Sequence, residues 1–294
     1  MKGIVLLNYY SPPKGCINQA ERLKEEFAAR GVEIEILPNT LAARGIGRDG
    51  SGFARFGESD FCVYLDKDKY ASEILERVGL RLFNSHRAIR ICDDKAETHV
   101  ALSGIGIPMP KTLPGLLCYD MKCELNDDVV SQVEAEFGYP VIVKSCFGSL
   151  GKGVWKADDR DELRALMREL QFSPHLFQEF IKSSVGRDVR VILIGGRVVA
   201  AMKRSSETDF RSNIELGGVG EVFELPSDFK AIAERAACAL GLDYCGLDLM
   251  FGEDGSPILC EVNSNAFFAG IERVTGVNIA GKYADHIIEQ MKNS

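Results

Sequence analysis

The sequence predicts an α/β domain with a parallel sheet, followed by a larger α+β region. Up to about residue 92, short apolar strands alternate with amphipathic helices, the pattern of a parallel sheet covered by helices. After Asp93 the pattern changes, and several strands are joined in pairs by glycine-containing turns, as in antiparallel hairpins. With 294 residues and 46% hydrophobic content, the chain can bury the cores of two or three compact units.

The first region has no recognisable cofactor fingerprint. We expect strands at residues 4–7, 32–37 and 61–65, and helices at residues 18–30 and 69–78. The first strand leads into NYYSPPKG, which lacks the glycine pattern of dinucleotide-binding domains. Residues 40–56 contain Arg44, Arg48 and Arg55 among glycines. We expect a mobile, solvated loop there, with an anion-binding substrate loop as the alternative.

The second region combines helices with antiparallel strands. We expect helices at residues 127–137, 160–170 and 227–240, and strands at residues 139–145, 153–157, 189–194, 197–204, 244–252 and 256–265. Gly195 and Gly196 predict a tight hairpin between two of these strands.

Composition excludes several classes of protein. Thirty-five Lys and Arg against 43 Asp and Glu give a formal charge of -8, which argues against a broad nucleic-acid or anionic-membrane surface. No apolar run is long enough for a signal peptide or a membrane span, so we expect a cytoplasmic protein. The nine cysteines are scattered without a CxxC pair, so neither a disulfide framework nor a zinc site is predicted.

Carboxylates from two neighbouring strands are predicted to face each other. If Asp254 and Gly255 form a two-residue turn, Asp248 lies opposite Glu261 and Gly246 lies opposite Asn263. Two carboxylates so placed repel each other unless a cation lies between them, and oxygen ligands suit magnesium bound to a nucleotide. The alternative is a polar turn with no metal, and a three-residue loop would break the pairing.

A glycine-rich segment and a lysine predict a site for phosphates. Gly148, Gly151 and Gly153 follow a strand ending in Lys144 and Ser145, and would let backbone N–H groups approach an anion. The segment is not a P-loop, because the motif glycine and hydroxyl residue are missing, so a flexible hairpin loop is the alternative. Lys144 lies in the apolar stretch PVIVKS, where burial is costly unless it meets an anion or a polar ring atom.

Two further charged groups have ordinary explanations. Asp188 and Arg190 share one face of a strand, and counting across Gly195-Gly196 places Asp188 opposite Lys203 as a surface ion pair. Arg211 follows the hairpin in the polar segment TDFRSN, where a lone arginine is normally solvated.

Taken in order, these segments resemble one family. CDDKAETHVALSGIGIPMPKT, YPVIVKSCFGSLGKGV, FQEFI, GRDVRVILIGGRVVAAMKR, DFRSN, GLDLM and CEVNSN resemble the ATP-grasp superfamily, and within it the RimK-like carboxylate-amine (alpha-L-glutamate) ligases. The resemblance runs from about Asp93 to the C-terminus and is loose before that. It implies an N-terminal domain at residues 1–92 and two ATP-grasp subdomains at residues 93–176 and 177–294.

The resemblance also implies roles for individual residues. Arg190 and Arg211 would be catalytic and face the transferred phosphoryl group or the acyl phosphate, and Asp248, Glu261 and Asn263 would bind Mg²⁺ or Mn²⁺. The implied ATP-binding residues are Lys95, Lys144, Gly148, Gly151, Gly153, Gln178, Glu179, Phe180, Ile181, Asp188, Arg190, Phe210, Arg211, Ser212 and Asn213.

The implied reaction is ATP-dependent amide formation through an acyl phosphate, with an amino acid such as glutamate added to an acidic small molecule or peptide terminus. The sequence leaves a homo-oligomer open. Alternatives are a ligase for a different amine, a non-catalytic nucleotide-binding subunit, or a phosphotransferase. Where many relatives have a small residue and then Ser-Pro-Gly, this chain has SNAFFAG, so we expect Asn265, Phe267 and Phe268 to alter the wall near the acceptor amine, which leaves the identity of the amine open. Arg204 either binds the amino-acid carboxylate or is an exposed strand-end arginine.

Overall fold

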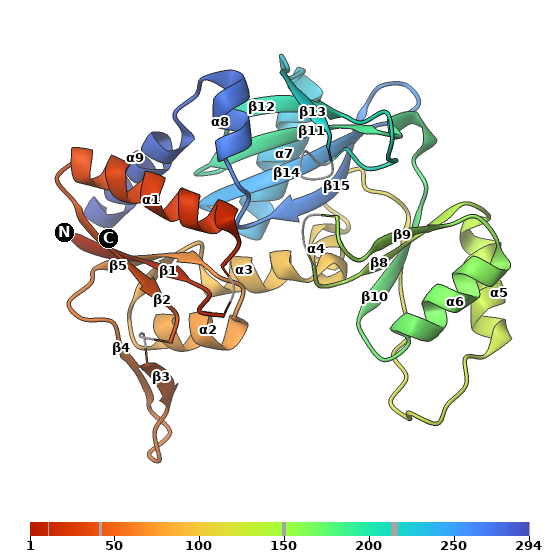
Figure 1. Ribbon diagram of the computed structural model, residues 1–294, viewed down its shortest axis with the longest axis horizontal. Coiled ribbons are helices and arrows are strands. Elements are labelled where there is room, and N and C mark those ends of the chain that lie inside the picture. The colour runs from red at the N-terminus through yellow and green to blue at the C-terminus, as the bar shows by residue number, and fades with distance from the viewer. Residues whose placement is uncertain (11, 41–42, 149–150, 213–216, 294) are drawn as a thin grey trace.

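The computed structural model describes residues 1–10, 12–40, 43–148, 151–212 and 217–293. Three sheets with their helices lie in a row in Figure 1, with the N-terminal domain at the left and the α5–α6 unit at the right. Within the described residues no helix is long and apolar enough to cross a membrane.

The N-terminal domain contains a four-stranded parallel sheet in the order β2-β1-β5-β6. Its elements are β1 (Lys2–Leu7), α1 (Lys14–Ala29), β2 (Glu33–Pro38), β5 (Phe61–Leu65), α2 (Lys69–Arg77), β6 (Arg81–Phe83) and α3 (His86–Asp93). Alternate residues of β1 and β5 pack against α1 on one face and against α2 and α3 on the other. The predicted parallel sheet is therefore confirmed.

The prediction of an irregular loop at residues 40–56 is wrong. It contains an antiparallel hairpin of β3 (Ala43–Ile46) and β4 (Gly52–Arg55), which projects from the domain at the bottom of Figure 1. Arg44 donates to the carbonyl of Asn39 at 2.8 Å and pairs with Asp68 at 2.6 Å, so it anchors the base of this hairpin. Arg48 and Arg55 are exposed.

The middle of the chain forms a four-stranded sheet, here called sheet C, in the order β7-β10-β8-β9. Its strands are β7 (Thr112–Pro114), β8 (Val141–Ser145), β9 (Val154–Ala157) and β10 (His175–Glu179). Helices α5 (Asp127–Phe137) and α6 (Arg160–Leu170) cover one face and share a core with Val141, Val143 and Phe177. The other face, with Ile142, Lys144 and Gln178, is turned toward the rest of the molecule.

The third sheet, here called sheet D, has five antiparallel strands in the order β13-β12-β11-β14-β15. They are β11 (Arg187–Ile194), β12 (Arg197–Ser205), β13 (Val219–Val222), β14 (Tyr244–Phe251) and β15 (Pro257–Asn263). One face is apolar and packs on α7 (Ser227–Leu240), α3 and α4 (Lys95–Leu102). The other face changes character along β11: Ile194 and Ile192 join an apolar core, whereas Arg190 and Asp188 do not.

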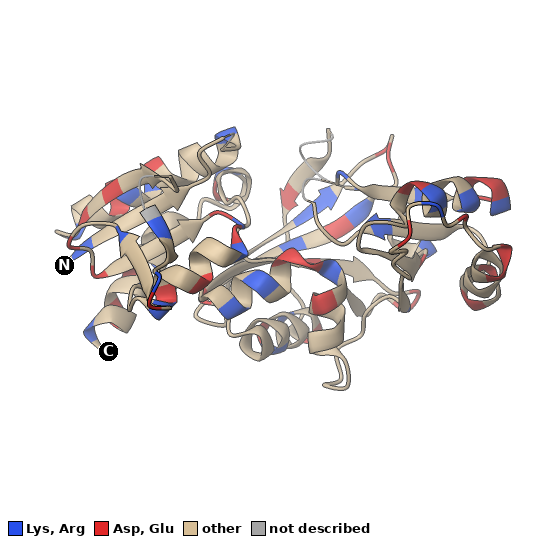
Figure 2. Cartoon of the chain, turned by 90° about the horizontal axis from the view of Figure 1, so that it is seen from below, with Lys and Arg blue, Asp and Glu red and all other residues tan. Residues whose placement is uncertain are grey.

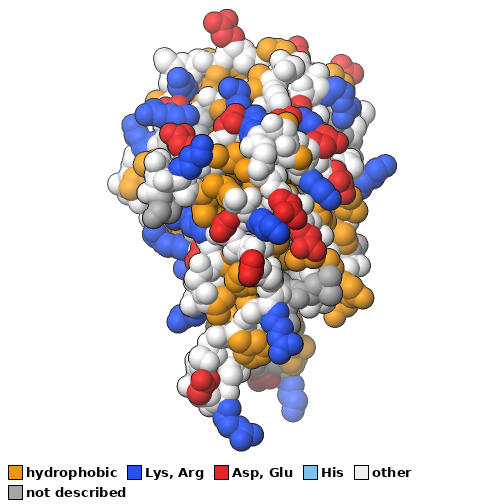
Figure 3. All heavy atoms as spheres, turned by 90° about the vertical axis from the view of Figure 1, so that its left-hand side faces the viewer, with side chains coloured by type: hydrophobic (Ala, Val, Ile, Leu, Met, Phe, Trp, Pro, Cys, Tyr) orange, Lys and Arg blue, Asp and Glu red, His pale blue; other side chains and the backbone are white. Residues whose placement is uncertain are grey.

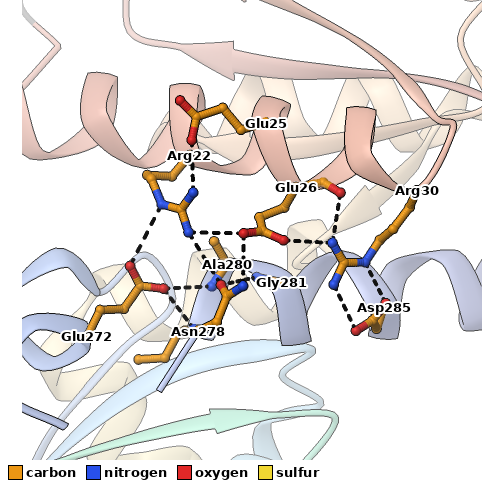
Figure 4. A network of polar contacts seen from close by, with 10 residues as sticks. Arg22, Glu25, Glu26, Arg30, Glu272, Asn278, Ala280, Gly281 and Asp285 are labelled. Carbon is orange, nitrogen blue, oxygen red and sulfur yellow. Dashed lines mark hydrogen bonds and ion pairs between the residues drawn. The ribbon is translucent and has the colours of Figure 1, made fainter. Parts of the chain in front are cut away.

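The chain returns to the N-terminal domain after sheet D. Helices α8 (Ala269–Thr275) and α9 (Ile279–Lys292) complete the apolar core that α1 and the parallel sheet begin. Figure 4 shows the polar rim of this contact, where Arg22, Glu26 and Arg30 of α1 meet Glu272, Asn278 and Asp285. The N-terminal domain is therefore fixed on the same subdomain that carries the end of β15.

Charges of both signs are interspersed over the molecule. Figure 2 shows blue and red positions interspersed along the described chain, and the face in Figure 3 mixes basic, acidic and apolar side chains above the projecting hairpin.

Candidate active site

A cavity lies between the open face of sheet C and the charged end of sheet D. Its empty volume is about 890 Å³, which includes solvent at its mouth. One end is apolar: Ile142, Val154, Phe180 and Met250 line a slot of the kind that holds a flat ring. The other end is charged and contains residues from α4, β8 and sheet D.

The floor of the charged end is a compact pattern of ion pairs. Asp188 of β11 lies opposite Arg204 of β12, and Arg190 of β11 lies opposite Asp248 of β14. Arg204 contacts Asp188 at 2.5 Å and also reaches Asp248 at 2.9 Å. Asp248 and Arg204 are only 4% and 3% exposed, so each guanidinium and carboxylate depends on its partners for solvation.

These partners decide the charge of Asp248. Burial alone would raise the pKa of its carboxyl group, but the charges of Arg190 and Arg204 and their hydrogen bonds outweigh that effect and lower the pKa. The pKa of Arg204 is raised, since Asp248 and Asp188 outweigh its burial. Asp248 is therefore an anion at neutral pH.

The predicted pairing of Asp248 with Glu261 is confirmed, although the turn was wrong. Gly252 donates to the carbonyl of Ser256 at 2.7 Å, so the loop has three residues rather than two. A bulge in β15 next to Leu259 shifts the register back by one residue, and Asp248 lies opposite Glu261. The bulge also turns both Cys260 and Glu261 toward the cavity.

The reasoning that led from this pair to a cation is wrong. Arg190 and Arg204 already neutralise Asp248, and Lys95 lies 3.9 Å from Glu261, so the two carboxylates need no metal ion to coexist. A magnesium site must be judged from the donor set instead.

The donor set fits a magnesium ion. Asp248 and Glu261 supply carboxylates, and Asn263, opposite Gly246, supplies an amide oxygen further along β15. In the described part of the chain, no three His, Cys, Asp and Glu side chains gather to hold a metal. Two carboxylates and an amide match the way magnesium is held when phosphates and water complete its shell.

Two lysines line the cavity. Lys95 begins α4 and donates to the carbonyl of Gly148 at 3.0 Å, and Lys144 of β8 lies 3.8 Å from the sulfur of Cys260. Each residue is 9% exposed. Burial lowers the pKa of Lys95, and Glu261 partly opposes this effect. Both ammonium groups are placed to bind an anion.

Arg211 holds Gly151, a described residue of the glycine-rich segment, at the cavity. Arg211 donates to the carbonyl of Gly151 at 2.7 Å and pairs with Asp209 at 2.7 Å. Gly148, Gly151 and Gly153 all have positive φ, which strongly favours glycine over residues with a Cβ. Arg211 is therefore held by two partners and is not the solvated arginine that its polar sequence segment suggests.

Comparisons with known proteins agree with this architecture. Residues 92–287 match the family model described as a RimK-like ATP-grasp domain. The chain belongs to the RimK-like ATP-grasp family.

Similar proteins carry ligase and synthase names. The chain is 38% identical over 228 residues to beta-citrylglutamate synthase B of Danio rerio, covering 77% of this chain and 55% of that protein. It is 35% identical over 235 residues to human N-acetylaspartylglutamate synthase A, covering 79% and 58%. The chain thus spans little more than half the length of these two relatives. A probable alpha-L-glutamate ligase of Psychromonas ingrahamii is 34% identical, over 92% of this chain and 91% of that protein.

Solved structures show the same fold. A RimK domain ATP-grasp protein of Sphaerobacter thermophilus superimposes with a TM-score of 0.72 at 22% identity, covering 97% of this chain and 99% of that one. The ATP-grasp ligase PsnB, in a complex with a minimal precursor, Mg and ADP, gives 0.70 at 22% identity, covering 99% and 98%.

Most residues that the RimK-like resemblance implied lie together. Those that line the cavity are Lys95, Lys144, Gly151, Gln178, Glu179, Phe180, Ile181, Asp188, Phe210, Arg211, Ser212, Asp248 and Glu261. Among the described residues, Gly148, Gly153, Arg190 and Asn263 are not part of this lining. Asn213 lies outside the described residues.

The predicted pairing of Asp188 with Lys203 is wrong, and one of the two alternatives for Arg204 is excluded. The Gly195-Gly196 turn forms as predicted, but a bulge between Leu193 and Ile192 shifts the register, so Asp188 faces Arg204 instead of Lys203. Arg204 is buried in the cavity floor and is not an exposed strand-end residue. Sequence reasoning also missed His99 and Met250, because neither belongs to a recognisable motif.

Proposed function

We propose that the protein is an ATP-dependent ligase that joins a carboxylate to an amine. The observation that supports this most is the juxtaposition of Asp248 and Glu261 with Lys95 and Lys144 beside an apolar slot, in a chain of the RimK-like family. A nucleotide base fits the slot, and its phosphates fit the charged end.

In this proposal the charged residues neutralise a transferring phosphoryl group. Asp248, Glu261 and Asn263 would hold Mg²⁺, which supplies positive charge at the phosphates when bound. Lys95, Lys144 and Arg211 would bind the phosphate oxygens. Transfer to the substrate carboxylate would make an acyl phosphate, which the amine attacks to release phosphate.

We propose a role for Arg190 that differs from the catalytic one implied by the family resemblance. Arg190 is committed to Asp248, so we propose that it orients this carboxylate and that Arg211 is the arginine nearer the phosphoryl group. The contact of Arg211 with Gly151 would draw the glycine-rich segment over the reacting groups and exclude water.

The names of the relatives suggest the substrate class. Citrylglutamate synthase, N-acetylaspartylglutamate synthase and alpha-L-glutamate ligase all name glutamate. We propose that glutamate, or another amino acid, is the amine, and that the carboxylate belongs to an acidic small molecule or a peptide terminus.

One experiment separates this proposal from its alternatives. Purified protein with Mg²⁺, ATP, a panel of amino acids and a panel of acidic acceptors should release phosphate and give a product whose mass equals both substrates less water. A subunit that only binds nucleotide would release no phosphate under any combination. Added hydroxylamine should trap the acyl phosphate as a hydroxamate, whereas a phosphotransferase acting on a hydroxyl group would give none.

A further inference from the structure

His99 and Gln178 make a hydrogen bond at the edge of the cavity. Nε2 of His99, on α4, lies 2.9 Å from Nε2 of Gln178, on β10, and Gln178 is 1% exposed. Nδ1 of His99 lies 2.8 Å from the backbone carbonyl of Lys95. A carbonyl oxygen only accepts, so the ring proton is on Nδ1. In the neutral ring Nε2 must then be the acceptor, and Gln178 donates to it.

Thr112 imposes the same orientation from the other side. It lies directly opposite Gln178, on the neighbouring strand β7. Its hydroxyl donates to the carbonyl of Pro110 at 2.7 Å, so its oxygen accepts from Nε2 of Gln178 at 2.9 Å. The ring of His99 and the hydroxyl of Thr112 are each oriented by a backbone carbonyl, and together they accept hydrogen bonds from both amide hydrogens of Gln178.

This leaves the side-chain carbonyl of Gln178 for a ligand. Gln178 lines the cavity beside Ile142 and Met250, in the apolar slot. Within the described part of the chain no group donates to Oε1 of Gln178. The slot therefore presents a fixed hydrogen-bond acceptor and no competing amide donor.

We propose that His99 is a positioning residue that, together with Thr112, holds the carbonyl of Gln178 toward the base, so that the cavity selects a purine with an exocyclic amino group. The inference rests on the proposed nucleotide-binding function. Adenine offers an amino group to Oε1 of Gln178. Guanine would place its O6 against the same oxygen, and the two acceptors would repel.

The surroundings keep His99 neutral, as this role requires. The charged groups that approach it are Lys144, from β8, and Lys95, on its own helix. Burial lowers the pKa of His99, and the charge of Lys144 lowers it further, while the bond to the Lys95 carbonyl opposes them. A protonated ring would turn Nε2 into a donor and reverse the amide of Gln178.

The test measures nucleotide binding alone, without the second substrates. Dissociation constants are measured by calorimetry for Mg·ATP, Mg·GTP and Mg·purine riboside triphosphate, which lacks the exocyclic amino group. Wild-type protein should bind ATP roughly five- to tenfold more tightly than the purine analogue. In His99→Phe the ratio of the two dissociation constants, purine analogue over ATP, should fall to about one. His99→Gln should keep most of this preference, because its amide oxygen can accept in place of Nε2.

The outcomes distinguish this inference from the proposed function. If the wild type binds ATP and the purine analogue equally, or His99→Phe keeps the wild-type ratio, the inference is wrong while nucleotide binding stands. If none of the three nucleotides binds the wild type, the proposed function fails and takes this inference with it. Should His99→Phe not fold, Thr112→Val makes the same test from β7, and its ratio should also fall.

Discussion

Arg190 of β11 and Asp248 of β14 lie directly opposite each other and form an ion pair beneath the cavity. Arg204 reaches the same carboxylate at 2.9 Å. Asp248 is therefore held by two guanidinium groups in the protein itself. This gives the residue a part in stability that is separable from metal binding.

Replacing Asp248 should destabilise the fold. In Asp248→Asn, Arg190 loses its charged partner and Arg204 loses one of two, and breaking such a buried pair costs roughly 3 kcal/mol. Urea denaturation should show the loss as a lower midpoint with an unchanged slope. Asp254→Asn, in the exposed turn, is the matched control and should leave the midpoint unchanged. Equal midpoints for the two variants would contradict the buried network.

Replacing Glu261 should affect metal dependence rather than stability. Its side chain is 30% exposed, and its cation neighbour Lys95 is 3.9 Å away, so Glu261→Gln should cost less than about 1 kcal/mol. The Mg²⁺ concentration for half-maximal ATP binding should rise roughly tenfold or more. Glu253→Gln, in the loop before β15, should leave that concentration unchanged. A wild-type magnesium dependence in Glu261→Gln would remove this residue from the metal site.

Lys144 should show opposite effects on stability and binding. It is 9% exposed, and within the described part of the chain its ammonium group makes one long hydrogen bond, to the sulfur of Cys260. Lys144→Met removes a buried charge without breaking an ion pair, so the midpoint of urea denaturation should stay the same or rise. ATP affinity should fall at least tenfold, because a buried ammonium-phosphate contact is lost. A large loss of stability with unchanged affinity would show that Lys144 is structural.

His99 should contribute to the pH dependence of stability. Its pKa is lowered in the folded protein, whereas in the unfolded chain it is about 6.5. Below that pH the unfolded state takes up a proton that the folded state still refuses, so the free energy of unfolding falls as pH decreases. Denaturation between pH 8 and pH 5 should show a smaller fall for His99→Gln than for the wild type. Identical pH profiles would mean that His99 is not held neutral.

Hydrophobic periodicity was enough to predict most helices and strands. The segment from Asp127 to Phe137 is a helix as expected, since its polar N-cap Asn126 and the terminal Gly138 mark both ends. The hairpin β3–β4 was not predicted, because its glycines and arginines hide the alternation that identifies a strand. Its Ile46 and Phe53 are exposed, so no apolar face identified it either.

Strand registers were harder to predict than the strands, because bulges leave no simple trace in the sequence. The count from Asp254-Gly255 reached Asp248 and Glu261 only because an extra loop residue and the bulge in β15 cancel. The count from Gly195-Gly196 failed, because the bulge in that hairpin has nothing to cancel it. The turn residues predicted the first pairs of the β11–β12 hairpin correctly but not those of β14–β15, and bulges decide the rest of each register.

The partners of buried polar groups could not be read from the sequence at all. Arg204 contacts residues 16 and 44 positions away, and Gln178 contacts His99 across 79 positions. Such contacts depend on how sheets C and D and helix α4 are placed in space.

The central claim is that Asp248 and Glu261 together hold a metal ion that carries the phosphates of ATP. Crystals grown with Mn²⁺ and a non-hydrolysable ATP analogue test this directly through the anomalous signal of manganese. The account predicts a metal peak between the two carboxylates, with the base in the slot beside Met250 and Gln178. A nucleotide bound there with its metal coordinated by neither carboxylate, or a metal peak elsewhere in the protein, would contradict it.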